Sequence, residues 1–166
     1  TLDAIAEAGG LGFIAHPYWS CLTAPELLGL RHCLGLEVIN YGCEVEIAKG
    51  LSTVHWDDVL LRGARYFAFG VDDGHRCGWD FYGGFTMIKA AALTAPAVLE
   101  ALRCGQCYAS MGPLIHDLRV TEEWLEVECT PAQAINFVAN NQGGWCHLRE
   151  RGPLVQSARY LRSGQE

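Results

Sequence analysis

The chain has 166 residues, half of them hydrophobic, and a formal net charge of −7. This length and composition suffice to bury a core and exclude an intrinsically disordered chain. The acidic balance argues against bulk nucleic-acid binding, and no apolar run is long enough to cross a bilayer, so we expect no membrane partner. The eight cysteines are scattered rather than arranged as a disulfide framework, which predicts reduced thiols and a cytoplasmic protein.

The chain opens with a pattern of alternating helix and strand. The apolar run at 11–15 predicts a strand, and this strand should close on His16 because Pro17 cannot extend a ladder. Thr23 and Glu26 then have the spacing of a capping box, which predicts that a second helix begins there.

Six further elements continue the alternation as far as residue 110. The expected elements are a strand at 36–39, a helix at 52–63, strands at 66–71 and 85–90, a helix at 94–104 and a strand at 106–110. Strands that alternate with helices predict a mainly parallel sheet, and continuous apolar runs suit strands that are buried on both faces. We therefore expect an α/β fold over residues 1–112.

The character of the sequence changes at Gly112-Pro113. Three runs at 114–120, 124–129 and 135–139 have the composition of strands separated by turns, and the second alternates apolar and polar residues as a half-exposed strand does. The polar tail beyond them carries no clear element. Residues 113–166 are thus predicted to form a small β-rich appendage.

Ionisable and polar residues stand at the ends of the first three expected strands. The first closes on His16, the second on Asn40, and the third on Asp73, with His75 two residues later. Such groups are costly to bury unless they are paired or bound to metal. In β/α barrels the C-terminal ends of the strands carry the active site. The pattern therefore predicts a site for Zn²⁺, Mn²⁺ or Fe²⁺ formed by His16, Asp73 and His75.

Each of these residues also has a structural interpretation. Asp73 and His75 could form a turn with a side-chain hydrogen bond, and Asn40 could either touch substrate or shape its turn. Glu37 is expected to point away from the strand ends. Arg76 is the basic residue placed to meet a substrate phosphate.

Several spaced motifs together resemble the PHP domain, the polymerase and histidinol phosphatase superfamily of metal-dependent phosphoesterases, in its CehA-like branch. They are Phe13-Ile-Ala-His-Pro-Tyr-Trp-Ser20, Leu36-Glu-Val-Ile-Asn40, Val71-Asp-Asp-Gly-His75 and Ala101-Leu-Arg-Cys-Gly105. The resemblance implies that residues 1–112 are the C-terminal portion of a distorted (β/α)7 barrel. It further implies that the complete protein holds two or three divalent metals, with His16, Asp73 and His75 among the ligands. The implied reaction is hydrolysis of a small phosphate ester, with Asp73 and His75 as the catalytic candidates.

One family motif is missing. PHP domains begin with His-x-His, which this sequence lacks. We therefore expect a C-terminal fragment that binds metal weakly and is inactive alone. Two alternatives stay open: amide or ester hydrolysis at the same metal site, and a non-catalytic degenerate barrel that serves as a binding module. The sequence does not indicate the oligomeric state.

Overall fold

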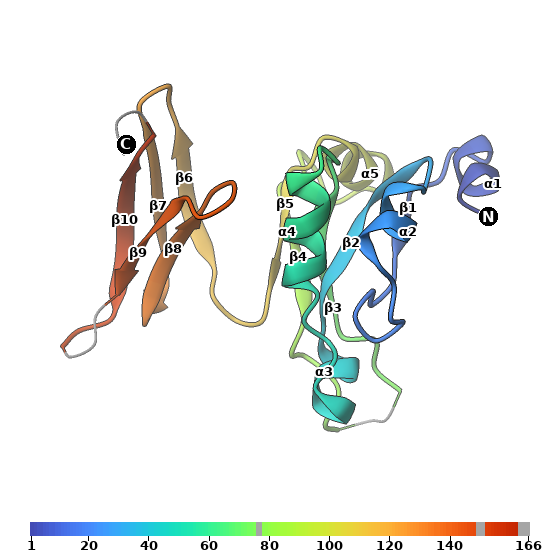
Figure 1. Ribbon diagram of the computed structural model, residues 1–166, viewed down its shortest axis with the longest axis horizontal. Helices are drawn as coiled ribbons and strands as arrows, with labels where there is room; N and C mark the ends of the chain where they lie inside the picture. The colour runs from blue at the N-terminus through green and yellow to red at the C-terminus, as the bar shows by residue number, and fades with distance from the viewer. Residues whose placement is uncertain (76–77, 149–151, 163–166) are drawn as a thin grey trace. The chain divides into compact units, whose positions relative to one another are not determined.

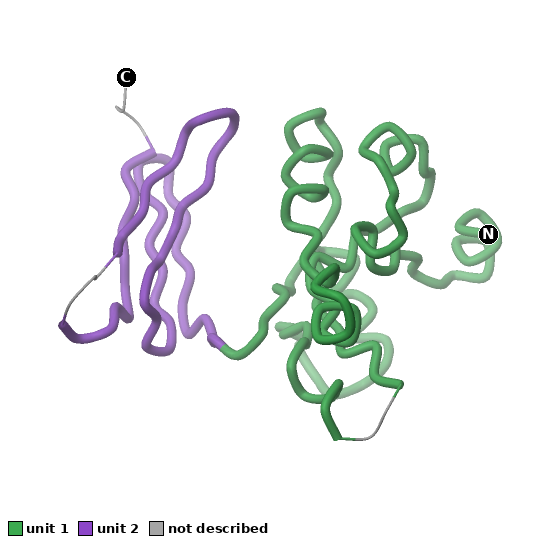
Figure 2. The backbone as a smooth tube through the Cα atoms, turned by 60° about the horizontal axis from the view of Figure 1, so that its bottom comes forward, with its two compact units in different colours: residues 1–112 green, residues 113–166 purple. Residues whose placement is uncertain are grey.

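A computed structural model describes residues 1–75, 78–148 and 152–162. The chain divides into two compact units, Thr1–Gly112 (unit 1) and Pro113–Glu166 (unit 2) (Figure 2). Among the described residues, no helix is both long and apolar enough to cross a membrane.

Unit 1 contains a three-stranded parallel sheet in the order β1-β2-β3 (Figure 1). Its strands are β1 (Gly12–Ile14), β2 (Cys33–Asn40) and β3 (Phe67–Val71). Four helices precede or connect them: α1 (Leu2–Glu7), α2 (Ala24–Leu28), α3 (Tyr41–Ile47) and α4 (Thr53–Leu61). The predicted capping box begins α2, where Glu26 Oε2 accepts from both the backbone N and the hydroxyl of Thr23.

The core of unit 1 joins two helices to the central strand. Leu27 of α2, Leu36 of β2 and Val59 of α4 are fully buried against one another. Burial of each such side chain stabilises the fold by roughly 1.5–3 kcal/mol. A hydrogen bond from the Tyr66 hydroxyl to the carbonyl of Leu27 further connects the segment before β3 to α2. This packing fixes β2, whose far end carries the site described below.

An antiparallel ribbon lies next to the parallel sheet. It pairs β4 (Phe85–Ile88) with β5 (Cys107–Ser110), and α5 (Ala95–Arg103) connects the two strands. Thr86 holds the ribbon beside β3, since its hydroxyl accepts from the backbone N of Gly70 and donates to the Gly70 carbonyl.

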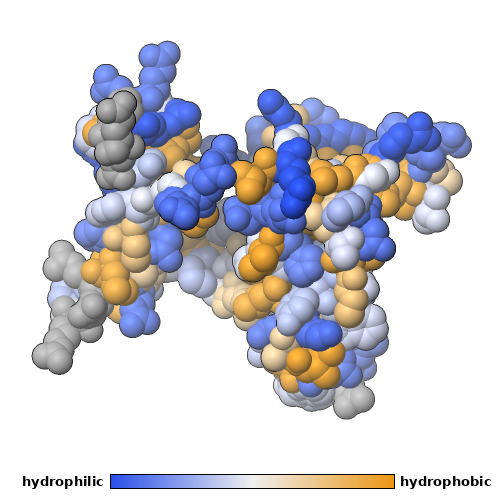
Figure 3. Space-filling view, viewed as in Figure 1, coloured by the Kyte–Doolittle hydropathy of each residue, from blue (hydrophilic) through white to orange (hydrophobic). Residues whose placement is uncertain are grey.

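Unit 2 consists of strands alone in its described part. An antiparallel sheet has the order β10-β7-β6, and a ribbon pairs β8 with β9. The bounds are β6 (Ile115–Val120), β7 (Trp124–Ala132), β8 (Ala134–Val138), β9 (Gly144–Leu148) and β10 (Val155–Leu161). Figure 3 shows hydrophilic surface over much of both units, interrupted by apolar patches. Val54 in unit 1 and Val138 in unit 2 are among the exposed apolar residues.

The (β/α)7 barrel expected from the sequence is wrong. Strands make up 36% of the structure and helices 23%, the reverse of a barrel in which every strand is followed by a helix. The described strands form four small sheets, and β4 and β5 pair antiparallel rather than parallel. A barrel wall also needs a neighbour at both edges of every strand, whereas β1 pairs only with β2 in the described part.

The sequence analysis also missed three elements. Helix α3 follows directly on β2, and strands β9 and β10 lie in the tail that was expected to be irregular. β10 pairs with β7 along most of its length and buries Val155 and Ala158.

Candidate metal centre

A pocket of about 350 Å³ lies at the C-terminal ends of the parallel strands. Residues that follow β1 and β3 line it, together with residues of α3. Its walls include the indoles of Trp19 and Trp79, each about half exposed. A pocket of this size suits a small ligand.

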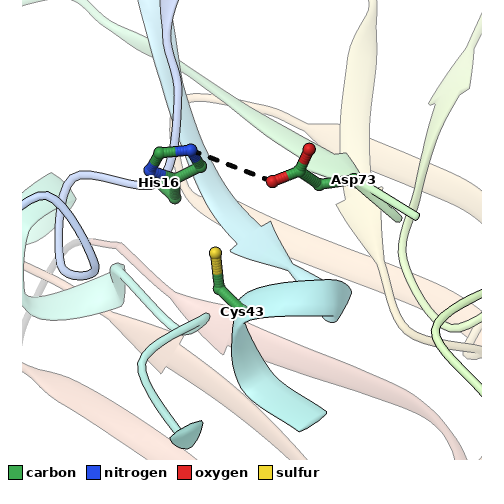
Figure 4. Close-up of side chains that lie close together, drawn as sticks. All are labelled: His16, Cys43 and Asp73. Atoms are coloured by element: carbon green, nitrogen blue, oxygen red, sulfur yellow. Dashed lines mark ion pairs between the residues drawn. The ribbon is translucent and has the colours of Figure 1, made fainter. Parts of the chain in front are cut away.

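Three potential ligand atoms of different chemistry converge in this pocket. They come from His16, Cys43 and Asp73, and all lie within 4.8 Å of one another. Figure 4 shows Cys43 rising from α3 towards the other two side chains. His16 Nε2 lies 3.8 Å from Asp73 Oδ2. Imidazole nitrogen, thiolate sulfur and carboxylate oxygen are all ligands of Zn²⁺.

His16 follows β1 directly and is held at both backbone and ring. Its backbone N donates to Glu37 Oε2 at 2.8 Å, and its Nδ1 lies 2.9 Å from the hydroxyl of Ser20. The edge of its ring meets Trp19. With Nδ1 engaged, Nε2 is the nitrogen that faces Asp73. The backbone of His16 has a φ of 28°, a conformation that costs energy for any residue except glycine.

Cys43 reaches the pocket because α3 begins where β2 ends. The Asn40 side chain caps this helix by accepting from the backbone N of Cys43 at 2.9 Å. The thiol is buried. Burial first, and then the negative charges of Asp73, Glu37 and Glu46, raise the pKa of Cys43 to about 11. The surroundings of the thiol are therefore anionic.

Asp73 and His75 lie on the loop after β3 but differ in position. Asp73 has a φ of 50° and accepts from Asn40 Nδ2 at 3.0 Å. The ring Nδ1 of His75 lies 2.7 Å from the Asp73 carbonyl, and His75 lines the pocket outside the group of three. Gly74 is required for space, because a Cβ there would collide with the ring of Phe81.

The loop that carries His75 is secured by the two other aspartates of this region. Asp72 accepts from the backbone N of Tyr82, Gly83 and Gly84 at 2.6–2.9 Å. The backbone N of His75 donates to Asp80, which is buried. Asp72 is thus engaged with the loop backbone.

The structure brings together two of the three predicted ligands and replaces the third, His75, by Cys43. His16 and Asp73 meet as expected, and Cys43 joins them. Asn40, expected as a possible substrate contact, is fully buried and hydrogen-bonded on both sides of its amide, so it shapes the site. The Glu37 carboxylate points towards the strand ends, contrary to expectation, and accepts there from the His16 backbone and the Asn40 amide without lining the pocket. Arg76 lies outside the described residues.

Comparisons with known proteins give one match of limited extent. No family model matches the chain, and no solved structure matches it. Expansin-A20 from Oryza sativa subsp. japonica is 33% identical over 92 residues, which are 52% of this chain and 35% of the expansin. The chain therefore spans about a third of the length of the curated relative that it matches.

These findings overturn the PHP resemblance. The matching relative is an expansin, and the fold is rich in strands rather than a β/α barrel. The description of the chain as a PHP-type phosphoesterase is wrong, and hydrolase activity or manganese or zinc binding no longer follows from a family resemblance. The motifs behind it were short segments at the ends of strands and of helix α5, and a few such segments do not specify a fold. Any chemistry must now be argued from the pocket itself.

Proposed function

We propose that unit 1 binds a divalent metal ion through His16, Cys43 and Asp73 and acts as a metal-dependent hydrolase, with a small phosphate ester as the expected substrate. One observation carries the proposal: three different segments deliver a nitrogen, a sulfur and an oxygen to a single pocket, all within 4.8 Å of one another. Three protein ligands beside an open pocket are the usual donor set of a catalytic zinc ion.

The dimensions and charge of the site suit a cation. Zinc bonds of about 2.0–2.2 Å to nitrogen and oxygen separate such tetrahedral ligand atoms by about 3.3–3.6 Å. The His16–Asp73 distance of 3.8 Å lies just above this range, so a small side-chain movement would bring both atoms to an ion. Glu37 and Glu46 add negative charge nearby, since both raise the pKa of Cys43. Adjacent anionic groups repel one another unless a positive charge compensates them.

The same charges argue against a thiol nucleophile. A reactive cysteine has a lowered pKa, which positive neighbours or a helix N-terminus provide. Cys43 lies near the start of a helix, but burial and carboxylates raise its pKa to about 11. The free thiol is therefore protonated at neutral pH, so a Cys-His-Asp triad is disfavoured and metal ligation is the better use of this sulfur.

A bound divalent ion would supply positive charge for an oxygen of the substrate and would lower the pKa of a water molecule. The residues of the chain hold and orient the reactants. Asp73 presents its carboxylate beside His16. His75, whose exposed ring lines the pocket, is placed to move a proton, since one ring nitrogen engages the Asp73 carbonyl. Trp19 and Trp79 offer apolar walls to a leaving group.

Metal content and turnover test the proposal together. The chain is freed of metal by a chelator, titrated with Zn²⁺ or Mn²⁺, and assayed with an aryl phosphate, a phosphodiester and an aryl ester. The expectation of weak metal binding and inactivity rested on the PHP resemblance, so we now expect one tightly bound ion per chain and phosphate release, both lost in Asp73→Ala. Turnover of the aryl ester alone would favour ester or amide hydrolysis, and metal without turnover would favour a binding module. Absence of metal binding would refute the proposal.

The cellular setting is part of the proposal. The seven cysteines that the structure describes are all free, which supports a reducing, cytoplasmic location. The net charge of −7 supports a small-molecule substrate rather than a nucleic acid.

A further inference from the structure

One buried side chain contacts the segments of two of the three proposed ligands, Cys43 and Asp73. Asn40 is the last residue of β2 and has no exposed surface. Its amide oxygen accepts from the backbone N of Cys43 at 2.9 Å. Its amide nitrogen donates to Asp73 Oδ2 and to Glu37 Oε2, each at 3.0 Å.

Glu37 extends this connection to the third ligand. Its side chain is buried, and the oxygen that accepts from Asn40 also accepts from the backbone N of His16. Glu37 and Asn40, hereafter the hub, therefore tie together the segments that carry His16, Cys43 and Asp73.

We infer that the hub positions the three ligands for metal binding, an inference that rests on the proposed function. A structural role alone would not require asparagine. Serine or aspartate would cap α3 equally well, but neither can also donate two N–H groups to two carboxylates. The amide holds the negatively charged Glu37 and Asp73 close to each other, an arrangement that is costly in a buried site without a cation.

The hub also explains why the ligand segments adopt uncommon backbone conformations. His16 and Asp73 both have positive φ and both receive or donate a hydrogen bond within the hub network. Such conformations persist only when the surroundings over-determine them. The hub supplies that constraint from the rigid end of β2.

Cobalt binding tests the inference without an activity assay. Asn40→Ser keeps an oxygen that can cap α3 but removes both N–H donors, whereas Glu37→Gln keeps the acceptor of the His16 backbone. In the folded proteins we expect Asn40→Ser to weaken Co²⁺ binding by about 10–100-fold and to change the thiolate-to-cobalt absorption band. We expect Glu37→Gln, which keeps the acceptor but loses the negative charge, to weaken Co²⁺ binding less than Asn40→Ser does. Asn136→Ser, on the exposed face of β8, is the matched control and should bind as the wild type does.

The outcomes separate the inference from the proposed function. If Asn40→Ser folds and binds Co²⁺ as the wild type does, the inference is overturned. If the wild type binds no metal, the proposed function fails, and NMR shifts of the metal-free protein decide on the hub. Asn40→Ser should then move the signals of His16, Cys43 and Asp73 together, and movement of one alone would overturn the inference. If both hub variants unfold, the pair serves the fold and the inference is equally overturned.

Discussion

The two units treat polar side chains in opposite ways. Among the described residues, every buried polar or charged side chain lies in unit 1, and Glu37 and Asn40 are two of them. In its described part, unit 2 buries only apolar residues and cysteine, and its ion pairs lie at the surface, where Arg119 and Arg159 both contact Glu126. Surface pairs contribute little to stability, whereas buried polar groups must be compensated. The difference locates the candidate chemistry in unit 1.

The largest effect should come from the core that supports β2. Leu36→Ala removes a fully buried side chain and should lower the free energy of unfolding of unit 1 by about 2–5 kcal/mol. Urea denaturation followed by circular dichroism measures this loss. Val127→Ala in unit 2 removes less volume and should cost less. An equal or greater loss at Val127 would mean that unit 2 has the more tightly packed core.

Cys43 and Cys129, the two cysteines that are buried in the described part of the chain, give a direct comparison between the units. Cys43→Ser replaces a soft ligand by a hard one and should weaken Zn²⁺ binding on the order of a hundredfold. Cys129→Ser, on β7, introduces the same hydroxyl into a buried position and should leave Zn²⁺ binding unchanged. Competition with a chromogenic chelator measures both affinities. Similar affinities for the two variants would remove Cys43 from the site.

His75 separates the ligand set predicted from the sequence from the set seen in the structure. Because His75 lies outside the group of three, His75→Ala should change metal affinity less than about threefold, while slowing any turnover. Calorimetric titration with Zn²⁺ provides the measurement. A hundredfold weakening would restore His75 as a ligand, as the Asp-x-His spacing predicted.

The smallest effect is expected at the exposed ion pairs of unit 2. Glu126→Gln removes the carboxylate that Arg159 contacts at 2.7 Å, and should lower stability by less than about 1 kcal/mol because solvent screens the pair. Thermal denaturation at low and high salt should show the small loss shrinking as salt rises. A larger loss of stability that does not depend on salt would contradict the conclusion that the ion pairs of unit 2 lie at the surface and contribute little.

Local patterns in the sequence were sufficient to predict many elements. The Thr23–Glu26 capping box is present, and strands β1, β2 and β3 lie where apolar runs indicated them. Helix α3 was missed because its apolar residues alternate with period two, the pattern of a strand, and because Asn40 was not considered as a helix cap. Its side chain is also the cap of the helix, a signal that the sequence does contain.

The site was predicted only in part, and for a definite reason. His16 and Asp73 follow strand ends, which hydrophobic runs reveal. The direction of Glu37 depends on a shift in the β2–β3 register between Glu37 and Ile39. Such an irregularity re-aims a side chain and breaks the alternation on which sequence reasoning relies. Cys43 was missed in turn, because its position depends on α3.

Because His16 and Asp73 have positive φ values, selection for stability and selection for metal binding favour different residues at these two positions. Glycine would adopt either conformation at no steric cost, so a library screened for thermal stability alone should enrich glycine at these two positions. A library screened for metal retention should instead keep the imidazole and the carboxylate. The chain thus keeps an imidazole and a carboxylate at two positions where the backbone conformation favours glycine. The difference in residue frequencies at these positions between the two libraries would measure how strongly metal binding requires the two side chains.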